Sequence, residues 1–172
     1  IGLFIAVIFS PGDISIIYGS PSSRRRYIDV LISQSDTNYL KTLQRYNGVL
    51  QQRNQLLKRL QEGKASTDEL SFWNIELIKT GSWLIHHRAE ALNEIANTAA
   101  ISLRTITETH ENLSIKYRPN VSIQDSMDIE NTFSDSLRSS YKRELAFGST
   151  LVGPHRDDFE LIVNGANMKY YA

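Results

Sequence analysis

The chain has 172 residues, 41% of them hydrophobic, so it is long enough for one or two small domains with a buried core. Its 19 Lys and Arg balance its 19 Asp and Glu, which excludes a general electrostatic attraction to nucleic acid or anionic lipid and leaves only local binding. The lack of cysteine excludes disulfides, zinc–thiolate sites and Cys nucleophiles, and it agrees with the cytoplasmic location that we expect.

The chain opens with an apolar run from Leu3 to Phe9, which ends at the breaker sequence SPGD. The run is too short to span a bilayer and has no basic region before it, so we expect a buried strand and no membrane partner. Because the sequence begins with Ile and stops at YYA without a closing element, we expect a piece of a longer protein.

A helix is predicted to start at Ser20-Pro21, because a serine hydroxyl can cap a helix and proline fits its first position. After a polar break at 33–36, apolar residues recur at spacings of three, four and seven, which indicates one buried stripe on a long helix. The stripe comprises Tyr39, Leu43, Tyr46, Leu50, Leu57 and Leu60.

Gly63 interrupts this helix, and Ser66 with Glu69 forms a capping box that begins a second long helix. Two amphipathic helices joined by a short turn are expected to fold back as an antiparallel hairpin, an arm roughly 40 Å long if its first helix has about 25 residues. The leucines expected to face one another across the hairpin are Leu43, Leu50, Leu57, Leu77 and Leu84.

The last third of the chain predicts a small antiparallel sheet and one more helix. Strands are expected from Leu113 to Tyr117, from Phe159 to Val163 and, after an Asn-Gly hairpin turn, from Met168 to Tyr171. Apolar residues in steps of four, from Ile129 to Leu145, predict a helix that ends at Gly148. The expected fold class is therefore α+β and helix-dominated, with a long antiparallel, coiled-coil-like hairpin and a small antiparallel sheet with a packed helix.

Three consecutive arginines, Arg24, Arg25 and Arg26, lie in the first turns of the predicted helix, where cations oppose the helix dipole. One interpretation is contact with DNA phosphates, with Arg24 and Arg26 as the candidates. The alternative is intramolecular pairing with Asp29 and Asp36, or simple solvation. The residue types alone leave both open.

The sequence GPHRDD places His155, Arg156, Asp157 and Asp158 directly before a predicted strand. Neighbouring side chains on a strand point to opposite faces, so one face can meet a partner while the other closes an internal ion pair. A structural Arg–Asp pair and a site for metal or phosphate are equally compatible with these residues.

The sequence contains two long motifs, FSPGDISIIYGSPSSRRRYIDVLI and GPHRDDFELIVNG. They resemble the patterns FSPEDLxLVxGSPSxRRRFLD and GPHRDDLxLxING of the bacterial RecF family of DNA replication and repair proteins. The order of the motifs and the helical arm between them also agree with the family. The chain departs from it at Gly12, where the family has an acidic residue, and it contains neither a GxxxxGK[ST] motif nor Walker B acids.

The resemblance implies an ABC-type ATPase related to the structural maintenance of chromosomes proteins, active in DNA replication, the SOS response and recombinational repair of gaps. ATP and Mg are the implied cofactors of the complete protein, with none expected for this piece alone. The implied partners are DNA, including gapped DNA and junctions of single and double strands, together with RecR, RecO and a second copy in an ATP-dependent homodimer.

By the same resemblance, the chain would cover the middle of the family. Residues 1–19 would be a strand and a Q-loop-like turn of the nucleotide-binding lobe, with Ser10 and Asp13 as candidates for an indirect contact with nucleotide or magnesium. Residues 20–110 would be the arm, with its turn near 61–66. Residues 111–172 would belong to the lobe that carries the signature motif, where His155, Arg156, Asp157 and Asp158 could couple lobe position to nucleotide or DNA.

Two other functions remain as alternatives. The first is a coiled-coil protein-interaction module without any nucleotide function. The second, least favoured, is a metal-dependent hydrolase that uses His155, Asp157 and Asp158 of GPHRDD.

We predict that the chain alone does not hydrolyse ATP, because it has no Walker A, signature or Walker B motif to hold the transferred phosphoryl group and its magnesium. Phosphate release from ATP, measured with malachite green, should equal the buffer background. Turnover that survives repurification and disappears in Asp157→Ala would instead favour the hydrolase.

Overall fold

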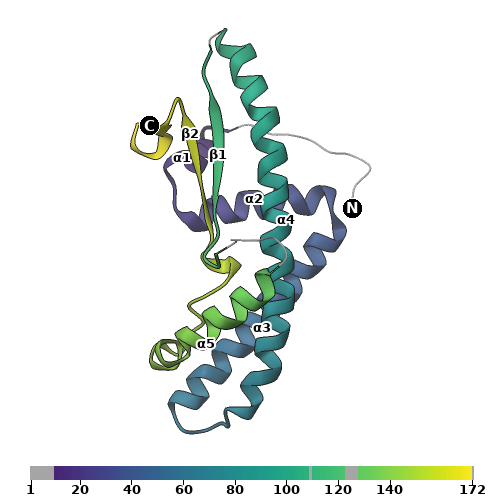
Figure 1. Cartoon of the computed structure of the whole chain (residues 1–172), viewed down its shortest axis with the longest axis vertical. Coiled ribbons are helices and arrows are strands. Elements are labelled where there is room, and N and C mark those ends of the chain that lie inside the picture. Colours follow the sequence, from purple (N-terminus) through teal and green to yellow (C-terminus); the bar gives the residue numbers. More distant parts are fainter. Residues whose placement is uncertain (1–9, 109, 123–127, 172) are drawn as a thin grey trace. The chain divides into compact units, whose positions relative to one another are not determined.

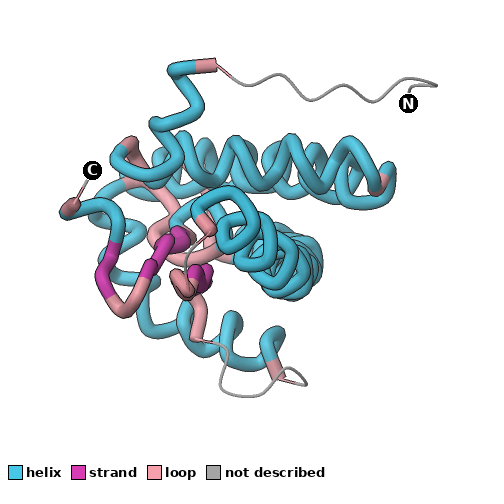
Figure 2. The backbone as a smooth tube through the Cα atoms, turned by 90° about the horizontal axis from the view of Figure 1, so that it is seen from above, coloured by secondary structure: helices cyan, strands magenta, loops and turns pink. Residues whose placement is uncertain are grey.

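A computed structural model describes residues 10–108, 110–122 and 128–171 of the chain. Helices make up most of the described residues and strands are few (Figure 2), which confirms the α+β, helix-dominated class. The strand expected at Leu3 to Phe9 lies outside the described residues. Within them, no helix combines the length and apolarity needed to cross a membrane.

The chain forms two compact units, each assembled from separate segments. Unit 1 combines residues 1–37, 87–118 and 157–172, and unit 2 combines 38–86 and 119–156. Helix α4, Asp68–Thr107, contributes to both, because its residues up to 86 belong to unit 2 and the later ones to unit 1. The division expected from the family resemblance, into residues 1–19, 20–110 and 111–172, stays a prediction.

Unit 2 contains the predicted helical hairpin, formed by α3 (Thr37–Gln61) and the first part of α4 (Figure 1). The helices run antiparallel, since Tyr39 of α3 stacks near Trp83 of α4 while Leu57 packs with Leu70. α3 has the predicted 25 residues. Gly63 has a φ of 70° in the turn after it, a left-handed conformation that glycine adopts without a steric penalty.

The buried stripe of α3 differs from the predicted one. Leu57, Leu77 and Leu84 are buried as expected, but Leu43 and Leu50 are half-buried. A helix has 3.6 residues per turn, so a strict seven-residue repeat drifts by about 20° per heptad around a straight helix. The residues of α3 that are buried are Tyr39, Tyr46, Val49, Arg53, Leu56 and Leu57.

The predicted third helix, α5 (Ile129–Phe147), packs against the hairpin of unit 2. A β-carbon on Gly81 of α4 would lie 2.5 Å from Cε1 of Phe133, so the glycine permits this close approach. α5 ends at Gly148, as predicted. This glycine has a φ of 61° and caps the helix in the left-handed conformation.

Unit 1 contains α2 (Pro21–Ser35) and a three-stranded antiparallel sheet of order β1-β2-β3. β1 (Leu113–Arg118) pairs with β2 (Asp158–Val163) in a register that places Leu113 opposite Val163 and Arg118 opposite Asp158. Alternate residues of β1 are half-buried and exposed, as the sequence pattern predicts. This register brings the GPHRDD segment to the end of β1.

The closing strand was predicted at the wrong residues. β3 consists of Ala166–Asn167, and Met168–Tyr170 forms a 3-10 turn instead of a strand. The Asn164-Gly165 turn itself is confirmed, with φ of 51° and 82°. The side chain of Asn167 accepts a hydrogen bond from the backbone N–H of Lys169 at 3.0 Å, a local bond that competes with strand pairing.

We predict that Leu57→Ala lowers the free energy of unfolding by about 2 to 5 kcal/mol, because its side chain is 0% exposed in the hairpin core. Leu50→Ala, the matched change at a half-buried position of the same helix, should cost clearly less. Urea unfolding followed by circular dichroism measures both. Equal losses at the two positions would contradict the observed stripe.

Candidate functional site

The arginine run of α2 is positioned by the start of its helix. Ser20 caps α2 by accepting a hydrogen bond from the backbone N–H of Ser23 at 3.3 Å, and Pro21 occupies the first helical position. The arginines therefore follow one another around the helix at steps of about 100°. They have different environments, because Arg24 is buried, Arg25 is half-buried and Arg26 is exposed.

Arg24 forms a two-bond ion pair with Asp158 at the start of β2. Its Nε and Nη2 donate to the two carboxylate oxygens at 2.6 and 2.8 Å, and its Nη1 donates to the backbone oxygen of Gly19 at 2.7 Å. With 3% of its side chain exposed, Arg24 takes the intramolecular role that the sequence left open. A contact between Arg24 and DNA stays untested, and this geometry does not favour it.

The ion pair shifts the pKa of both partners. The hydrogen bond from Arg24 to Asp158 raises the pKa of the guanidinium, and this effect exceeds the opposing effect of burial. Burial by itself would raise the pKa of Asp158, but the hydrogen bonds from Arg24 and from the backbone N–H of Phe159 hold that pKa below its usual value. Both groups are therefore charged in the folded protein at neutral pH.

A cluster of three further charged groups, one arginine and two aspartates, lies beside this ion pair. Arg88 of α4 donates to both carboxylate oxygens of Asp29 on α2, at 2.9 to 3.0 Å, and to Asp157 at 3.2 Å. The hydroxyl of Tyr117 on β1 also donates to Asp157. We call the seven groups the arginine–aspartate network of unit 1: Arg24, Arg25, Arg88, Asp29, Asp157, Asp158 and Tyr117.

Burial and charge also shift the pKa of two other groups in the network. Burial lowers the pKa of Arg25, and the nearby positive charge of Arg88 lowers it further. Arg25 donates to the backbone oxygen of Asp157 at 2.7 Å, so its hydrogen bond goes to the GPHRDD segment and not to Asp29. Burial and the Asp157 carboxylate raise the pKa of Tyr117 well above its usual value, which keeps the phenol protonated.

His155 and Arg156, the other ionisable residues of GPHRDD, belong to unit 2. The Nδ1 of His155 lies 2.7 Å from the hydroxyl of Tyr46, and its Nε2 donates to the backbone oxygen of Thr150 at 3.2 Å. Arg156 is exposed and has a long hydrogen bond of 3.4 Å to the same oxygen. The chain thus passes from unit 2 to unit 1 within the motif, between Arg156 and Asp157.

Gly153 allows the start of the motif to pack within unit 2. Its φ is 132°, and a β-carbon there would come within 2.7 Å of the Tyr46 hydroxyl and 2.9 Å of Cζ of Phe133. Its backbone N–H donates to the side chain of Asn120 at 3.0 Å. Steric contacts therefore favour glycine at this position of the motif, and the sequence alone did not indicate these contacts.

Unit 2 also contains a buried ion pair that the sequence did not indicate. Arg53 donates to Glu144 at 2.6 Å and to Thr150 at 2.7 Å, and the side chains of Arg53 and Glu144 are 1% and 0% exposed. Glu144 also accepts from the backbone N–H of Leu151 at 2.8 Å. One feature of the sequence could have indicated this ion pair: Arg53 lies on the apolar side of α3, between Val49 and Leu56.

Ser10 and Asp13 form a local turn. The backbone N–H of Ser10 donates to a carboxylate oxygen of Asp13 at 2.6 Å, across the 3-10 turn Pro11–Ile14. Their predicted role near nucleotide is not tested by this geometry. Across the described residues, no group of three or more His, Asp or Glu side chains could hold a metal ion.

The chain is similar in sequence to bacterial proteins named "DNA replication and repair protein RecF". It is 39% identical to the protein of Acetivibrio thermocellus and 38% identical to that of Bacillus thuringiensis, over 99% of this chain in both cases. These alignments cover 47% of each relative, so the chain spans about half the length of the curated relatives it matches. No protein-family model matches the chain.

Solved structures agree with the sequences. A structure described as the recombination mediator protein RecF with ATP superposes with a TM-score of 0.93 at 36% identity, covering 99% of this chain and 46% of that chain. A structure described as RecF-ATPrS superposes with a TM-score of 0.92. The fold of the chain is thus similar to that of about half of each of the structures described as RecF. Over the part that it spans, the chain is similar to RecF proteins in both sequence and structure.

We predict that Asp158→Asn destabilises the protein at neutral pH but has little effect in acid. The folded-state pKa of Asp158 is depressed, so its charge stabilises the fold above the unfolded-state pKa of about 3.9, and this contribution is lost as pH falls through the folded-state value. Urea unfolding at several pH values measures the difference between the variant and the parent. Asp135→Asn, at an exposed carboxylate of α5, is the control. A loss that stays the same in acid would show that packing, not charge, is responsible.

Proposed function

We propose that this chain is part of a RecF-like, ATP-dependent DNA-binding protein that acts in DNA replication and in recombinational repair of gaps. The observation that carries the proposal is the identity of 38 to 39% to RecF proteins across 99% of the chain. The two motifs quoted from the sequence lie within this alignment. Neither the coiled-coil module nor the metal-dependent hydrolase has a comparable observation in its favour.

ATP is the proposed nucleotide of the complete protein, since related structures are described with ATP and with ATPrS. Magnesium would accompany the phosphates, and Ser10 and Asp13 are proposed to act indirectly, through the turn that they hold together. The related structures are of RecF in the RecFOR pathway, which supports RecO and RecR as proposed partners. An ATP-dependent homodimer and a cytoplasmic location complete the proposal.

Arg26 is the residue of the arginine run that we propose to contact DNA. It is exposed, and no hydrogen bond or ion pair links it to another described residue. Phosphate contacts need this kind of accessible cation. Arg24 and Arg25 would act on DNA binding indirectly, because their hydrogen bonds hold α2 to Asp158 at the start of β2 and to Asp157 directly before it.

The GPHRDD motif is proposed to transmit movement between lobes rather than to touch substrate. Its histidine is hydrogen-bonded within unit 2, and its two aspartates are hydrogen-bonded within unit 1. A segment with an anchor in each unit can respond to a change in either. This role rests on the proposed nucleotide cycle of the complete protein.

We predict that Arg26→Glu in the full-length protein weakens DNA binding and lowers the slope of log affinity against log salt by about one unit per lost phosphate contact. Thermal unfolding should change little, because Arg26 is exposed. Arg143→Glu, the same change at an exposed arginine of α5, is the matched control. Fluorescence anisotropy with gapped DNA over a series of salt concentrations measures the slope. Equal effects of the two variants would remove Arg26 from the interface.

A further inference from the structure

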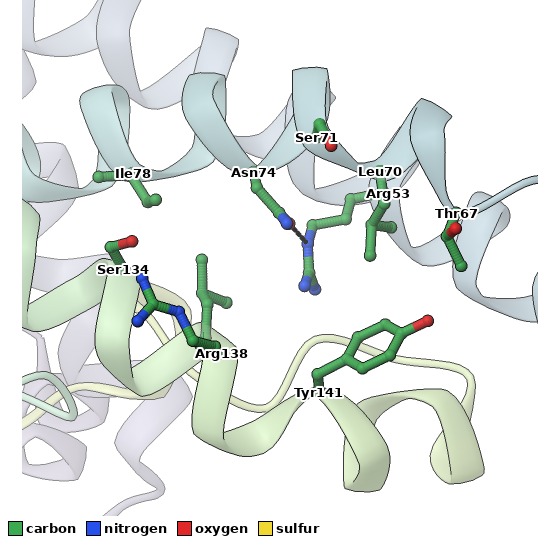
Figure 3. Close-up of a pocket in the computed structure, with 10 residues that line it drawn as sticks. Arg53, Thr67, Leu70, Ser71, Asn74, Ile78, Ser134, Arg138 and Tyr141 are labelled. Carbon is green, nitrogen blue, oxygen red and sulfur yellow. Dashed lines mark hydrogen bonds between the residues drawn. The ribbon is translucent and has the colours of Figure 1, made fainter.

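Unit 2 contains a groove of about 460 Å³ between α4 and α5 (Figure 3). One wall is formed by Ser71, Asn74 and Ile78 of α4. The facing wall is formed by Ser134, Arg138 and Tyr141 of α5. Its volume lies in the range of pockets that bind ligands or side chains of a partner.

The spacing of the wall residues suits a helix as the occupant. On α4 the positions 71, 74 and 78 are separated by three and four residues, and so are 134, 138 and 141 on α5. This spacing places each set on one helical face. Two antiparallel helices with such facing surfaces can bind a third helix between them, whose side-chain ridges fit between theirs. From Thr67 to Ile78 the groove is roughly 16 Å long, or about three helical turns.

The floor and rim of the groove supply apolar contact. Leu70 and Leu137 lie along its floor together with Ile78. Ile75 follows Ser71 by four residues and so lies beside it on α4, where it is 64% exposed. An amphipathic helix in the groove would cover these side chains and remove Ile75 from water.

The charges of the groove favour an acidic occupant. Among its described lining residues are two arginines and no carboxylate. Arg53 projects between Asn74 and Tyr141 (Figure 3), but its side chain is 1% exposed and is neutralised by Glu144, so Arg138 is the accessible cation of the lining. Arg138 is 79% exposed and is paired loosely, at 3.5 Å, with Asp135.

We propose that this groove binds an acidic amphipathic helix of a partner protein. Apolar side chains of the helix would pack on Ile75 and Ile78, above the buried Leu70 and Leu137, and an Asp or Glu would reach the exposed guanidinium of Arg138. A nucleic acid is the poorer fit, because Glu144 already balances Arg53 and a duplex needs several unpaired cations. This site is separate from the DNA and ATP roles proposed above and does not depend on them.

The test uses the 172-residue chain and two labelled helical peptides of about 14 residues, roughly four turns. Both carry leucines at helical spacing, one with glutamates and the other with lysines at the flanking positions. In fluorescence anisotropy, the acidic peptide should bind at least about tenfold more tightly than the basic one. Equal binding of the two peptides would overturn the proposal.

Variants then locate the site. Arg138→Glu should weaken the acidic peptide about tenfold and favour the basic one, whereas Arg143→Glu, on another face of α5, should change neither. Ser134→Trp should block the groove to both peptides while the melting temperature is retained. If Arg138→Glu and Arg143→Glu behave alike, the groove is not the binding site. If free glutamate or inorganic phosphate displaces the peptide fully at low millimolar concentration, the groove is a pocket for small anions and the helix proposal fails.

Discussion

The fold depends on the neutralisation of buried guanidinium groups. Removing a charge from water costs several kcal/mol, so a buried arginine is stable only with a carboxylate and further hydrogen bonds around it. Arg24 and Arg88 meet this condition in unit 1 with Asp158, Asp157 and Asp29, and Arg53 meets it in unit 2 with Glu144. The partners of Arg24 and Arg53 lie 134 and 91 residues away in sequence, so these pairs select which distant segments come together.

The same requirement explains the ionisable residues of GPHRDD. His155 is hydrogen-bonded to the backbone oxygen of Thr150, Asp157 accepts from Arg88 and Tyr117, and Asp158 accepts from Arg24. Each side chain has its partner inside one unit, which leaves Arg156 as the exposed ionisable group of the motif. The two aspartates of the motif therefore support the positions of α2, α4 and the sheet within unit 1.

Local signals predicted much of this fold, and long-range burial limited the rest. The Ser20 cap, the Gly63 turn and the Gly148 cap are encoded within a few residues, so the ends of the helices could be predicted. The buried stripe of α3 could not be predicted in full. A search for apolar periodicity treats Arg53 as a polar residue, and the partner that neutralises it, Glu144, is distant in sequence. The third strand was predicted at the wrong residues because of a local interaction. The side chain of Asn167 accepts a hydrogen bond from the backbone N–H of Lys169, and β3 ends at Asn167.

The arginine run shows why adjacent residues of one type need separate interpretations. Successive residues of a helix differ by about 100°, so three in a row cannot all face the same surface. Arg24 turns into the network, Arg25 reaches a backbone oxygen beside it, and Arg26 faces solvent. Loss of DNA binding in an Arg24 variant would therefore not identify a phosphate contact, because removing one partner of this ion pair also displaces α2. The same loss in an Arg26 variant with unchanged stability would identify one, since no internal bond of the described chain is broken.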